Sequence, residues 1–409
     1  MKIEELKNKK IAILGFGKEG KSTLDFLLRI GSKDITVLDK NFINLDEDLY
    51  PNVLEISGEF YLDNLESFDV IIKSPGISPY HPKIQPYTNK LSSQAEIFFS
   101  NYLGKVIGVT ATKGKTTTVS ILYKILKNAG LKVKLVGNIG NPVLEEINLV
   151  AQEKYDYVIY ELSSYMLEGF VPKLHIGVLG NIFPDHVDWH NNSLEIYTQA
   201  KLNILKNAEH TLDGREILKN KNNILQNIKT PLLGEHNIRN ISLVNEICKI
   251  IGIPENILRD TVKTFQSIPH RLEKISEKNG IIFIDDAIST TPHSTIEAIK
   301  TFGKDIGTIF LGGLDRGGYS FEELVSYLKK YNISNIVLFP ETGSQIKKLL
   351  NSDLNILETS AMQEAIKFAF QNCKKGEVCL LSTASPSYNL YRDYIEQGED
   401  FKQQIINYK

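Results

Sequence analysis

The sequence has little sulfur, a single tryptophan and no excess of charge. Its 409 residues include three cysteines and three methionines, and 47 Lys and Arg residues balance 49 Asp and Glu residues, for a formal net charge of −2. The basic excess of proteins that coat nucleic acid is absent, so nucleic-acid binding is not expected. A local phosphate pocket is compatible with this charge, because it needs only one or two cations and oriented backbone N–H groups.

The three cysteines, Cys248, Cys373 and Cys379, lack the spacing of a metal site and are too few to staple a chain of this length. We therefore expect reduced thiols, as in cytosolic proteins. No apolar run approaches the roughly 18 residues of a membrane span, and the apolar stretch near the N-terminus ends at Lys18, too early for a signal peptide. The sequence thus predicts a cytoplasmic protein without membrane contact.

Length and pattern predict an α/β protein of three domains. At roughly 150 residues per domain, the length corresponds to about 2.7 domains. Short apolar strands alternate with helical patterns almost throughout, which favours parallel sheets. One boundary follows the polar pair Ser100 and Asn101, and another falls at Pro269, because proline cannot continue the preceding helical pattern. The expected domains are residues 1–102, 103–268 and 269–409.

The expected strands are apolar runs bounded by turn residues, and the expected helices have apolar residues at helical spacing. The strands are 11–15, 35–39, 70–73, 105–110, 157–161, 176–181, 281–285, 308–311, 335–339 and 377–382. The helices are 21–30, 93–99, 118–126, 194–205 and 257–265.

The sharpest motif is the run from Gly108 to Thr116, which contains Gly114-Lys115-Thr116 between an expected strand and an expected helix. This is the context of a phosphate-binding P-loop, although strict spacing would place a glycine at Val109. Loop N–H groups would hold phosphates, Lys115 would reach the β- and γ-phosphates, and the Thr116 hydroxyl would bind Mg²⁺. The alternative is a threonine-rich turn that merely caps a helix.

A second glycine-rich loop, Gly15-Phe16-Gly17-Lys18-Glu19-Gly20, lies between the first strand and the first helix, and Asp39 ends the next strand. The pattern is typical of dinucleotide-binding proteins, in which the glycines let the backbone approach a pyrophosphate. The same loop can serve any nucleotide diphosphate. A UDP-type ligand is favoured over NAD(P) or FAD, because a nicotinamide enzyme has no obvious need for an ATP loop in the next domain.

Three further side chains make chemical sense beside Mg·ATP. Glu161 ends a strand, His186 follows a strand, and Lys201 lies in an expected helix. Ligands of α/β proteins bind at the carboxyl ends of strands, where a carboxylate can complete the shell of a Mg²⁺ ion. Each residue taken singly is compatible with a purely structural role, and Asn138 is compatible equally with a ligand contact or a turn.

Taken together, these motifs resemble the Mur ligase family, most closely its glutamate-adding MurD type. The resemblance covers essentially the whole length and rests on the order and spacing of nine short segments. They are residues 110–118, 137–140, 161–164, 185–188, 200–202, 236–240, 269–271, 312–317 and 380–388.

The resemblance implies one ligand for each domain: a Rossmann-like N-terminal domain for the UDP substrate, a P-loop-type central domain for ATP and a Rossmann-like C-terminal domain for the amino acid. The implied UDP-substrate residues are Gly15, Gly17, Lys18, Gly20, Asp39, Ser74, Gly76 and Asn138. The implied ATP residues are Thr110, Thr112, Lys113, Gly114, Lys115, Thr116, Thr117, Asn237, Asn240, Arg271 and Asp286. The implied amino-acid residues are Thr290, Arg316, Ser387 and Tyr394.

The implied cofactors are two Mg²⁺ ions. Thr116 and Glu161 would bind one, and His186 and Lys201 would bind the other, with Lys201 carrying a carbamate formed with CO₂. Lys115, Glu161, His186 and Lys201 are the implied catalytic residues. A carbamate converts a cation into an oxygen ligand, which a hard divalent ion prefers.

The implied activity is ATP-dependent ligation of glutamate, expected to be D-glutamate, to UDP-N-acetylmuramoyl-L-alanine through an acyl phosphate. This reaction belongs to peptidoglycan precursor synthesis and thereby to cell shape and division. The enzyme is expected to be a cytoplasmic monomer that closes its domains around the substrates, which would protect the acyl phosphate from water.

Three positions depart from the family pattern. Ala111 replaces a loop glycine, which is tolerable where its φ is negative, and Met166 stands where glutamine is common. The largest departure is Ile288, at the place of a lysine that in many relatives lies near the reaction centre. Arg316 is the candidate replacement cation. The choice of amino acid, whether D-glutamate, L-glutamate or another, is therefore open.

Two other functions remain as alternatives. A folylpolyglutamate-synthase-like ligase would not need the roughly 100 residues before the ATP loop. A non-catalytic nucleotide-binding scaffold would not need Glu161, His186 and Lys201 together with that loop.

Overall fold

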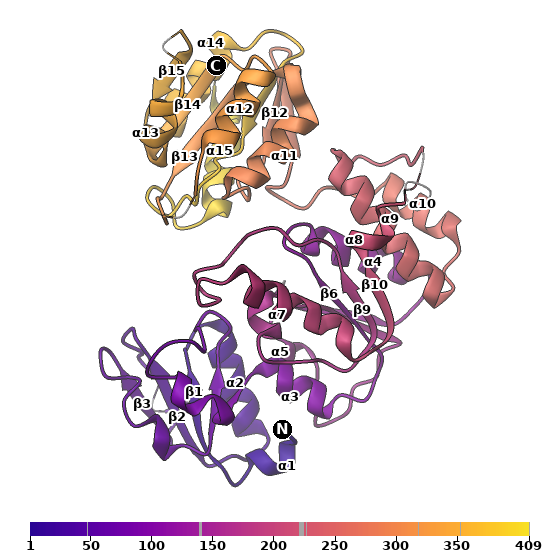
Figure 1. Ribbon diagram of the computed structural model, residues 1–409, viewed down its shortest axis with the longest axis vertical. Coiled ribbons are helices and arrows are strands. Elements are labelled where there is room, and N and C mark those ends of the chain that lie inside the picture. The colour runs from indigo at the N-terminus through magenta and orange to yellow at the C-terminus, as the bar shows by residue number, and fades with distance from the viewer. Residues whose placement is uncertain are drawn as a thin grey trace. The chain divides into compact units, whose positions relative to one another are not determined.

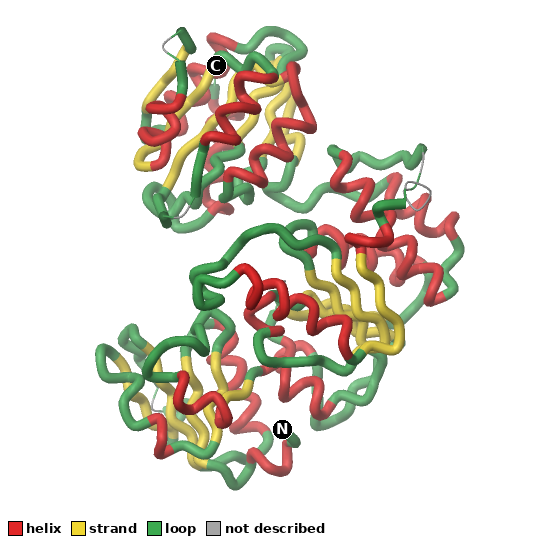
Figure 2. The backbone as a smooth tube through the Cα atoms, viewed as in Figure 1, coloured by secondary structure: helices red, strands yellow, loops and turns green. Residues whose placement is uncertain are grey.

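The computed structural model describes residues 1–46, 48–138, 141–220, 225, 227–317, 319–351 and 353–408. Its strands form three separate sheets, and helices lie beside each of them (Figures 1 and 2). The chain divides into two compact units, one of residues 1–227 and 239–261 and the other of residues 228–238 and 262–409. Ile139 and Gly140, which complete one of the predicted motifs, lie outside the described residues.

The first sheet is parallel throughout and has the order β3-β2-β1-β4-β5, the arrangement of a dinucleotide-binding fold. Its strands are β1 (Lys10–Leu14), β2 (Asp34–Asp39), β3 (Val53–Ser57), β4 (Val70–Lys73) and β5 (Leu91–Ser92). The accompanying helices are α1 (Ile3–Leu6), α2 (Lys18–Arg29), η1 (Leu65–Ser67), η2 (Gln85–Lys90) and α3 (Gln94–Asn101). The central strand β1 ends directly before the first glycine-rich loop.

The second sheet is also parallel, in the order β10-β9-β6-β8-β7, so that β6 is central. Its strands are β6 (Val106–Thr110), β7 (Val133–Gly137), β8 (Tyr157–Glu161), β9 (Leu174–Leu179) and β10 (Ala208–Asp213). Its helices are α4 (Lys115–Asn128), α5 (Val143–Glu146), α6 (Ser164–Leu167), α7 (Leu194–Lys206), α8 (Gly214–Ile217), α9 (Glu235–Ile251) and α10 (Glu255–Lys263). The loop after β6 therefore lies where the chain connections diverge to the two sides, which is where such sheets bind ligands.

The first two sheets share a hydrophobic core. Helices α2 and α3 both contact α5, and one cluster of buried residues includes Phe26 and Phe98 of the first domain together with Tyr160 and Leu144 of the second. This shared apolar surface explains why the first two domains form one compact unit, since its burial excludes water from both faces.

The third sheet has the order β11-β12-β16-β13-β14-β15. Its strands are β11 (Glu273–Lys278), β12 (Ile281–Asp285), β13 (Ile306–Gly313), β14 (Asn335–Glu341), β15 (Asn355–Glu358) and β16 (Val378–Leu381). Its helices are α11 (Pro292–Phe302), η4 (Gly303–Asp305), α12 (Glu322–Lys330), α13 (Thr342–Leu349), α14 (Met362–Asn372) and α15 (Tyr394–Asn407). Separate core clusters lie on its two faces.

The predicted three-domain α/β architecture is confirmed, and every strand and helix expected from the sequence is present with its ends shifted by a few residues. The sheets are parallel, as expected, except at one edge of the third sheet, where β11 pairs antiparallel with β12. Pattern analysis also missed the six strands at the edges of the three sheets, which are β3, β5, β7, β10, β11 and β15. Edge strands bury fewer side chains, so their apolar periodicity is weak.

None of the helices in the described part of the chain combines the length and the apolar character that spanning a bilayer requires.

Candidate active site

The loop after β6 has the backbone geometry of a phosphate cradle. Gly114 caps helix α4 with φ = +87°, a left-handed conformation that glycine adopts without a steric penalty. A Cβ atom on Gly114 would lie 2.7 Å from Oδ1 of Asn240, so glycine is also required for the approach of the α9 side chain. Ala111, in contrast, is not among the residues with positive φ, which agrees with its tolerance at a glycine position.

Side chains from the segment after β9 fix this loop. The Asn181 side chain accepts a hydrogen bond from Lys113 N (2.9 Å) and donates one to Lys113 O (2.8 Å). The hydroxyls of Thr112 and Tyr197 lie 2.7 Å apart, and Thr112 is buried. Asn181 and Tyr197 were not predicted as site residues. The position of Asn181, just beyond the strand next to β6, was the available signal.

Three lysines converge on the loop. Lys115 and Lys201 both donate through Nζ to the carbonyl oxygen of Ala111, each at 2.9 Å, and Lys115 also donates to Thr112 O (3.2 Å). Lys113 forms an ion pair with Asp185 at 3.2 Å. Close packing of like charges is costly, so the arrangement favours an anionic ligand such as a polyphosphate.

Lys201 is buried, with 2% of its surface exposed, although it is a lysine. Burial and the neighbouring Lys115 hold the pKa of Lys201 well below the usual lysine value. Its ammonium group also lies 4.9 Å from the centre of the Tyr197 ring. A lysine in this environment loses its proton easily, and the resulting free amine is a nucleophile.

Glu161 supplies a buried carboxylate beside the loop. It is the last residue of β8, pairs in register with Val109 of β6, and has no exposed surface. Its Oε1 accepts a hydrogen bond from Asn138 Nδ2 (3.0 Å), whereas its Oε2 has no hydrogen-bond partner among the described residues. A buried carboxylate oxygen without a donor fits a hard cation such as Mg²⁺. Thr110 ends β6, and Thr116 and Thr117 lie in the first turn of α4.

His186 and Asp185 follow the segment that holds the loop. His186 adopts φ = +51°, and its Nε2 lies 3.7 Å from Oδ1 of Asp185. Burial and the three neighbouring lysines lower the pKa of His186, although Asp185 opposes this shift. Burial alone would raise the pKa of Asp185, but Lys113 and His186 lower it below its usual value. His186 therefore tends to be neutral, which is the form that binds metals.

The first glycine-rich loop is built in a similar way. Gly15 has φ = +91°, and a Cβ atom on Gly20 would lie only 2.1 Å from Gly15 O, so neither position accepts a side chain without rearrangement. The Ser74 hydroxyl donates to Gly15 O (2.9 Å). Asp39 accepts a hydrogen bond from Phe16 N at 2.6 Å, so in this structure its carboxylate holds the loop itself.

The other implied UDP-substrate residues are less uniform in position. Gly17 caps α2, with open space where a Cβ atom would lie, and Lys18 begins that helix. Gly76 is exposed and follows Ser74. Asn138 instead donates to Glu161 and lies at the end of β7, so the structure groups it with the candidate metal ligand.

Helix α9 carries Asn237 and Asn240, the two asparagines that were expected to bind the adenine ring of ATP. Asn240 lies beside Gly114, as described above. Asn237, three residues earlier, is buried, and its side-chain amide donates to Leu233 O at 2.7 Å.

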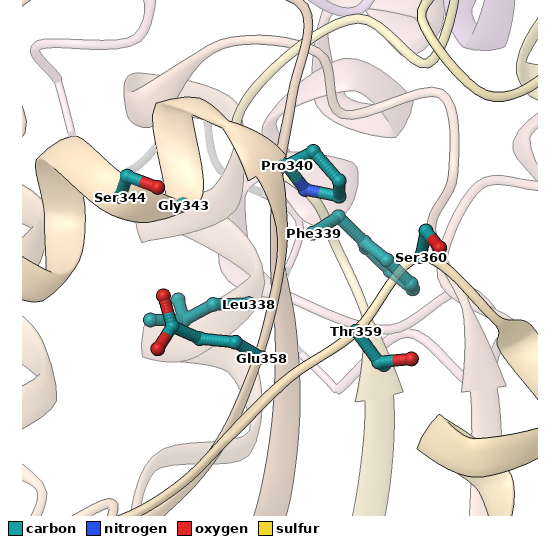
Figure 3. Close-up of a pocket in the computed structure, with 8 residues that line it drawn as sticks. All are labelled: Leu338, Phe339, Pro340, Gly343, Ser344, Glu358, Thr359 and Ser360. Carbon is teal, nitrogen blue, oxygen red and sulfur yellow. The ribbon is translucent and has the colours of Figure 1, made fainter.

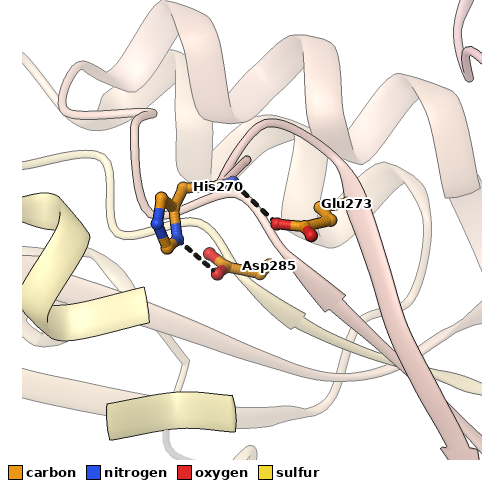
Figure 4. A group of neighbouring side chains, drawn as sticks. All are labelled: His270, Glu273 and Asp285. Atoms are coloured by element: carbon orange, nitrogen blue, oxygen red, sulfur yellow. Dashed lines mark hydrogen bonds and ion pairs between the residues drawn. The ribbon is translucent and has the colours of Figure 1, made fainter. Parts of the chain in front are cut away.

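In the C-terminal unit, Arg271 lies between two residues with strained backbone. His270 has φ = +62° and Leu272 has φ = +44°, and non-glycine residues adopt such angles only when their surroundings enforce them. His270 Nδ1 is hydrogen-bonded to Asp285 Oδ2 at 2.8 Å, and His270 N donates to Glu273 (2.9 Å) (Figure 4). These contacts fix the backbone from which Arg271 projects.

Asp286 holds the other side of Arg271. Its Oδ1 accepts a hydrogen bond from Leu272 N (3.2 Å), and its Oδ2 accepts one from Ser382 Oγ (2.7 Å). It is buried, so its immediate role in this structure is to position the Arg271 segment. Burial raises the pKa of Asp286 from 3.8 to about 7.

This pKa predicts how the stability of the protein changes with pH. Between about pH 4 and pH 7 the folded state keeps a proton on Asp286 that the unfolded chain releases, so the free energy of unfolding should fall as pH rises. One such proton gives a slope of at most about 1.4 kcal/mol per pH unit. Urea unfolding of the wild type and of Asp286→Asn across this range should show a shallower decline for the variant. Parallel curves would contradict the prediction.

The residues that were expected to bind the amino-acid substrate also lie in the C-terminal unit. The Arg316 guanidinium lies 5.1 Å from the centre of the Tyr388 ring, and Tyr394 begins α15, with its ring 6.0 Å from that of His270. Ser387 is buried, and its hydroxyl has no hydrogen-bond partner among the described residues. Thr290 is half-buried before α11. The orphaned Ser387 hydroxyl is the feature of this group that best fits a ligand.

The C-terminal unit also has a pocket of about 290 Å³ beside the ends of β14 and β15 and the first turn of α13 (Figure 3). Leu338, Phe339 and Glu358 are among its lining residues, and no residue predicted from the sequence lines it.

Comparison with known proteins places these features in a family. The N-terminal domain model of MurD-like Mur ligases matches residues 9–93, the Mur ligase middle domain matches residues 109–224, and the glutamate ligase domain of Mur ligases matches residues 270–384. Together the three models span the three sheets in chain order.

Curated relatives match over nearly the full length. A UDP-N-acetylmuramoylalanine–D-glutamate ligase of Acetivibrio thermocellus is 30% identical, over 99% of this chain and 97% of its own. A ligase of the same name from Francisella tularensis subsp. holarctica is 31% identical, over 96% of this chain and 95% of its own.

The fold is also that of a solved relative. The structure of the UDP-N-acetylmuramate-alanine ligase MurC from Thermotoga maritima matches with a TM-score of 0.60 at 17% identity, over 98% of this chain and all of that one. The chain therefore belongs to the Mur ligase family, and its N-terminal domain is of the MurD-like type.

Proposed function

We propose that the protein is an ATP-dependent ligase that joins D-glutamate to UDP-N-acetylmuramoyl-alanine in peptidoglycan precursor synthesis. The observation that carries this proposal is the similarity of essentially the whole chain to ligases of that name. The three ligands would be divided among the domains 1–102, 103–268 and 269–409, which would hold the UDP substrate, ATP and the amino acid.

The reaction has two steps in this proposal. The alanine carboxylate of the UDP substrate attacks the γ-phosphorus of ATP, which gives an acyl phosphate and ADP. The amine of glutamate then attacks the acyl carbon, loses a proton and expels inorganic phosphate, which leaves an amide. Both steps bring anionic groups together, so the site must neutralise negative charge.

The lysines around the P-loop suit this task. Lys115 and Lys113 belong to the loop itself, and Lys115 is the residue we assign to the β- and γ-phosphates. The ammonium group of Lys115 donates to the loop carbonyls of Ala111 and Thr112, so it lies within the loop that would hold the phosphates. Lys201, whose pKa is well below the usual lysine value, is assigned a different role. The loop N–H groups and the start of α4 would hold the remaining phosphate charge.

Two magnesium ions are part of the proposal. Thr116 and Glu161 would hold one, and the Oε2 of Glu161, which has no hydrogen-bond partner within the described part of the chain, supports this assignment. His186 and Lys201 would hold the other after Lys201 has reacted with CO₂, when its neutral amine forms an N–C bond and releases a proton to give a carbamate. Bound magnesium would supply positive charge to the phosphates and the reacting carboxylate.

The C-terminal unit would hold glutamate through Thr290, Arg316, Ser387 and Tyr394. The buried Ser387 hydroxyl and the exposed Arg316 loop are brought together by a hydrogen bond from Leu314 N to Pro386 O (2.7 Å). Arg316 would bind a substrate carboxylate and supply the positive charge of the lysine in whose place this chain has Ile288. Ile288 is also the observation that favours a second candidate, a ligase of the same type with another amino acid.

The relation to folylpolyglutamate synthases is the weaker alternative. Residues 9–93 match a MurD-like N-terminal domain and build a complete sheet with a glycine-rich loop, which a ligase of that kind would not need. We further propose that the enzyme acts as a monomer in the cytoplasm and contributes to cell-wall formation, cell shape and division.

A ligation assay tests the function directly. Purified protein is incubated with UDP-N-acetylmuramoyl-alanine, Mg·ATP and one amino acid at a time, and ADP release and the amide product are both measured. We expect turnover that requires the UDP substrate and is fastest with D-glutamate. Turnover with L-glutamate or another amino acid instead would favour the second candidate. ADP release at the same rate with and without the UDP substrate would contradict the proposal.

A further inference from the structure

The glycine-rich face of the N-terminal domain is tied directly to the central domain. Trp189 of the central domain donates through Nε1 to the carbonyl oxygen of Gly76 (3.1 Å). The Ser78 hydroxyl donates in return to the carbonyl oxygen of Trp189 (2.8 Å). The reciprocal bonds join the loop 74–80, which holds two of the residues assigned to the UDP substrate, to the segment that carries His186.

A partly buried acid, Glu168, strengthens the same connection. Glu168 of the central domain accepts a hydrogen bond from the Tyr80 hydroxyl (2.6 Å) on one oxygen. Its other oxygen is hydrogen-bonded to Nδ1 of His190 at 2.9 Å, and His190 has no exposed surface. Glu168 thus bonds to both domains at once.

From Trp189 and His190, ring contacts lead to the proposed metal ligand and to the proposed ATP loop. The Tyr165 ring lies 4.4 Å from that of Trp189 and 5.2 Å from that of His186, which is the proposed metal ligand. The His190 ring lies 5.3 Å from that of Tyr197, whose hydroxyl is bonded to Thr112 of the ATP loop as described above.

Lys73 of the N-terminal domain contacts both the loop 74–80 and Trp189. It is the last residue of β4, its ammonium group donates to the carbonyls of Ser74 and Ile77, and it lies 5.3 Å from the centre of the Trp189 ring. The base of the substrate loop and the tryptophan therefore share one cation.

We propose that Trp189 and Glu168 are positioning residues that couple the two sites, so that the UDP substrate and the metal-bound nucleotide bind cooperatively. The proposal rests on the proposed function for the identity of the two ligands. A closely packed interior transmits a shift of one loop to the other, because its side chains have few alternative arrangements. A ligand that orders the connection at one end lowers the cost of ordering it at the other.

The chain provides its own reporter of this connection, because Trp189 is its only tryptophan. Its fluorescence can be followed while UDP-N-acetylmuramoyl-alanine is added, without and with a saturating non-hydrolysable ATP analogue and Mg²⁺. The ratio of the two dissociation constants measures the coupling. We expect the analogue to tighten substrate binding at least about fivefold, the lower end of typical allosteric coupling.

Two tyrosine variants separate coupling from general stability. Tyr80→Phe removes the hydroxyl that reaches Glu168, whereas Tyr50→Phe removes a similar hydroxyl–carboxylate bond, to Asp25 at 2.9 Å, inside the N-terminal domain. We expect the ratio to fall towards one in Tyr80→Phe and to stay at the wild-type value in Tyr50→Phe. Trp189→Phe, measured by calorimetry, should lose the coupling as well, because phenylalanine keeps a ring but cannot donate to Gly76.

The outcomes distinguish this inference from the proposed function. A wild-type enzyme that ligates D-glutamate but shows a ratio of one would overturn the coupling and leave the function intact. An unchanged ratio in both Tyr80→Phe and Trp189→Phe would show that these contacts are only structural and would also overturn the inference. A wild type that binds no UDP substrate would remove the proposed function, and the inference with it.

Discussion

Replacement of Lys201 by alanine is expected to abolish ligation. Lys201 is buried beside the P-loop and, as a carbamate, would be the ligand that brings a second magnesium ion to the phosphates. Loss of an electrostatic contact of this kind typically lowers kcat by about two to three orders of magnitude. Ligation rates of wild type and variant at saturating substrates test the prediction, and thermal melting checks that the variant is folded.

The carbamate makes a more specific prediction than the loss of activity. A short carboxylate such as acetate or propionate should occupy the space left by the side chain and restore part of the activity of Lys201→Ala, because it supplies the missing oxygen ligand. Labelling with ¹³C-bicarbonate should give a carbamate resonance in the wild type that the variant lacks. Lys206→Ala, at the exposed end of the same helix, is the matched control and should behave like the wild type. Full activity of Lys201→Ala would disprove the assignment.

Lys115→Ala should remove phosphoryl transfer while leaving the binding of the UDP substrate intact. Its ammonium group lies within the loop that would hold the phosphates, so its loss removes a positive charge that stabilises the transition state. We expect kcat to fall by about two to three orders of magnitude. The substrate loop 74–80 belongs to another domain and keeps its contacts with Trp189.

Acyl-phosphate formation and titration with UDP-N-acetylmuramoyl-alanine measure the two effects separately. Lys124→Ala, on the exposed face of the same helix, is the control and should change neither quantity. Equal losses of substrate binding and of phosphoryl transfer in Lys115→Ala would show that this lysine supports the whole site rather than the phosphates.

Local sequence predicted the backbone geometry of the two glycine-rich loops, because the requirements of such a loop are local. A strand, a glycine that can adopt positive φ and a helix N-terminus are consecutive in the chain, so Gly15 and Gly114 could be identified from spacing alone. The places of Glu161 and His186 after strands were predictable for a similar reason, since parallel strands end at a common edge.

Contacts between distant segments could not be predicted in this way. The hydrogen bond from Asn138 to Glu161 arises because β7 and β8 are neighbours in the sheet, and the expected role of Asn138 at the UDP substrate stays a prediction. The Asp286 carboxylate fixes the backbone beside Arg271, a contact that no motif indicated, and its expected role at the nucleotide stays a prediction. No spacing rule reveals which buried group a side chain will bond, since that depends on which strands pair.

The sequence by itself determined the three α/β domains, the two glycine-rich loops and the family, because these follow from periodicity and from motifs in fixed order. Only the tertiary structure decided which groups converge. It brought Lys115 and Lys201 to one carbonyl oxygen and left Oε2 of Glu161 without a donor among the residues that the structure describes. It also joined the loop 74–80 to the central domain through Trp189 and Glu168. The physical reason is that burial and charge neighbourhood, which set the chemistry of these groups, are properties of the packed chain and not of any local segment.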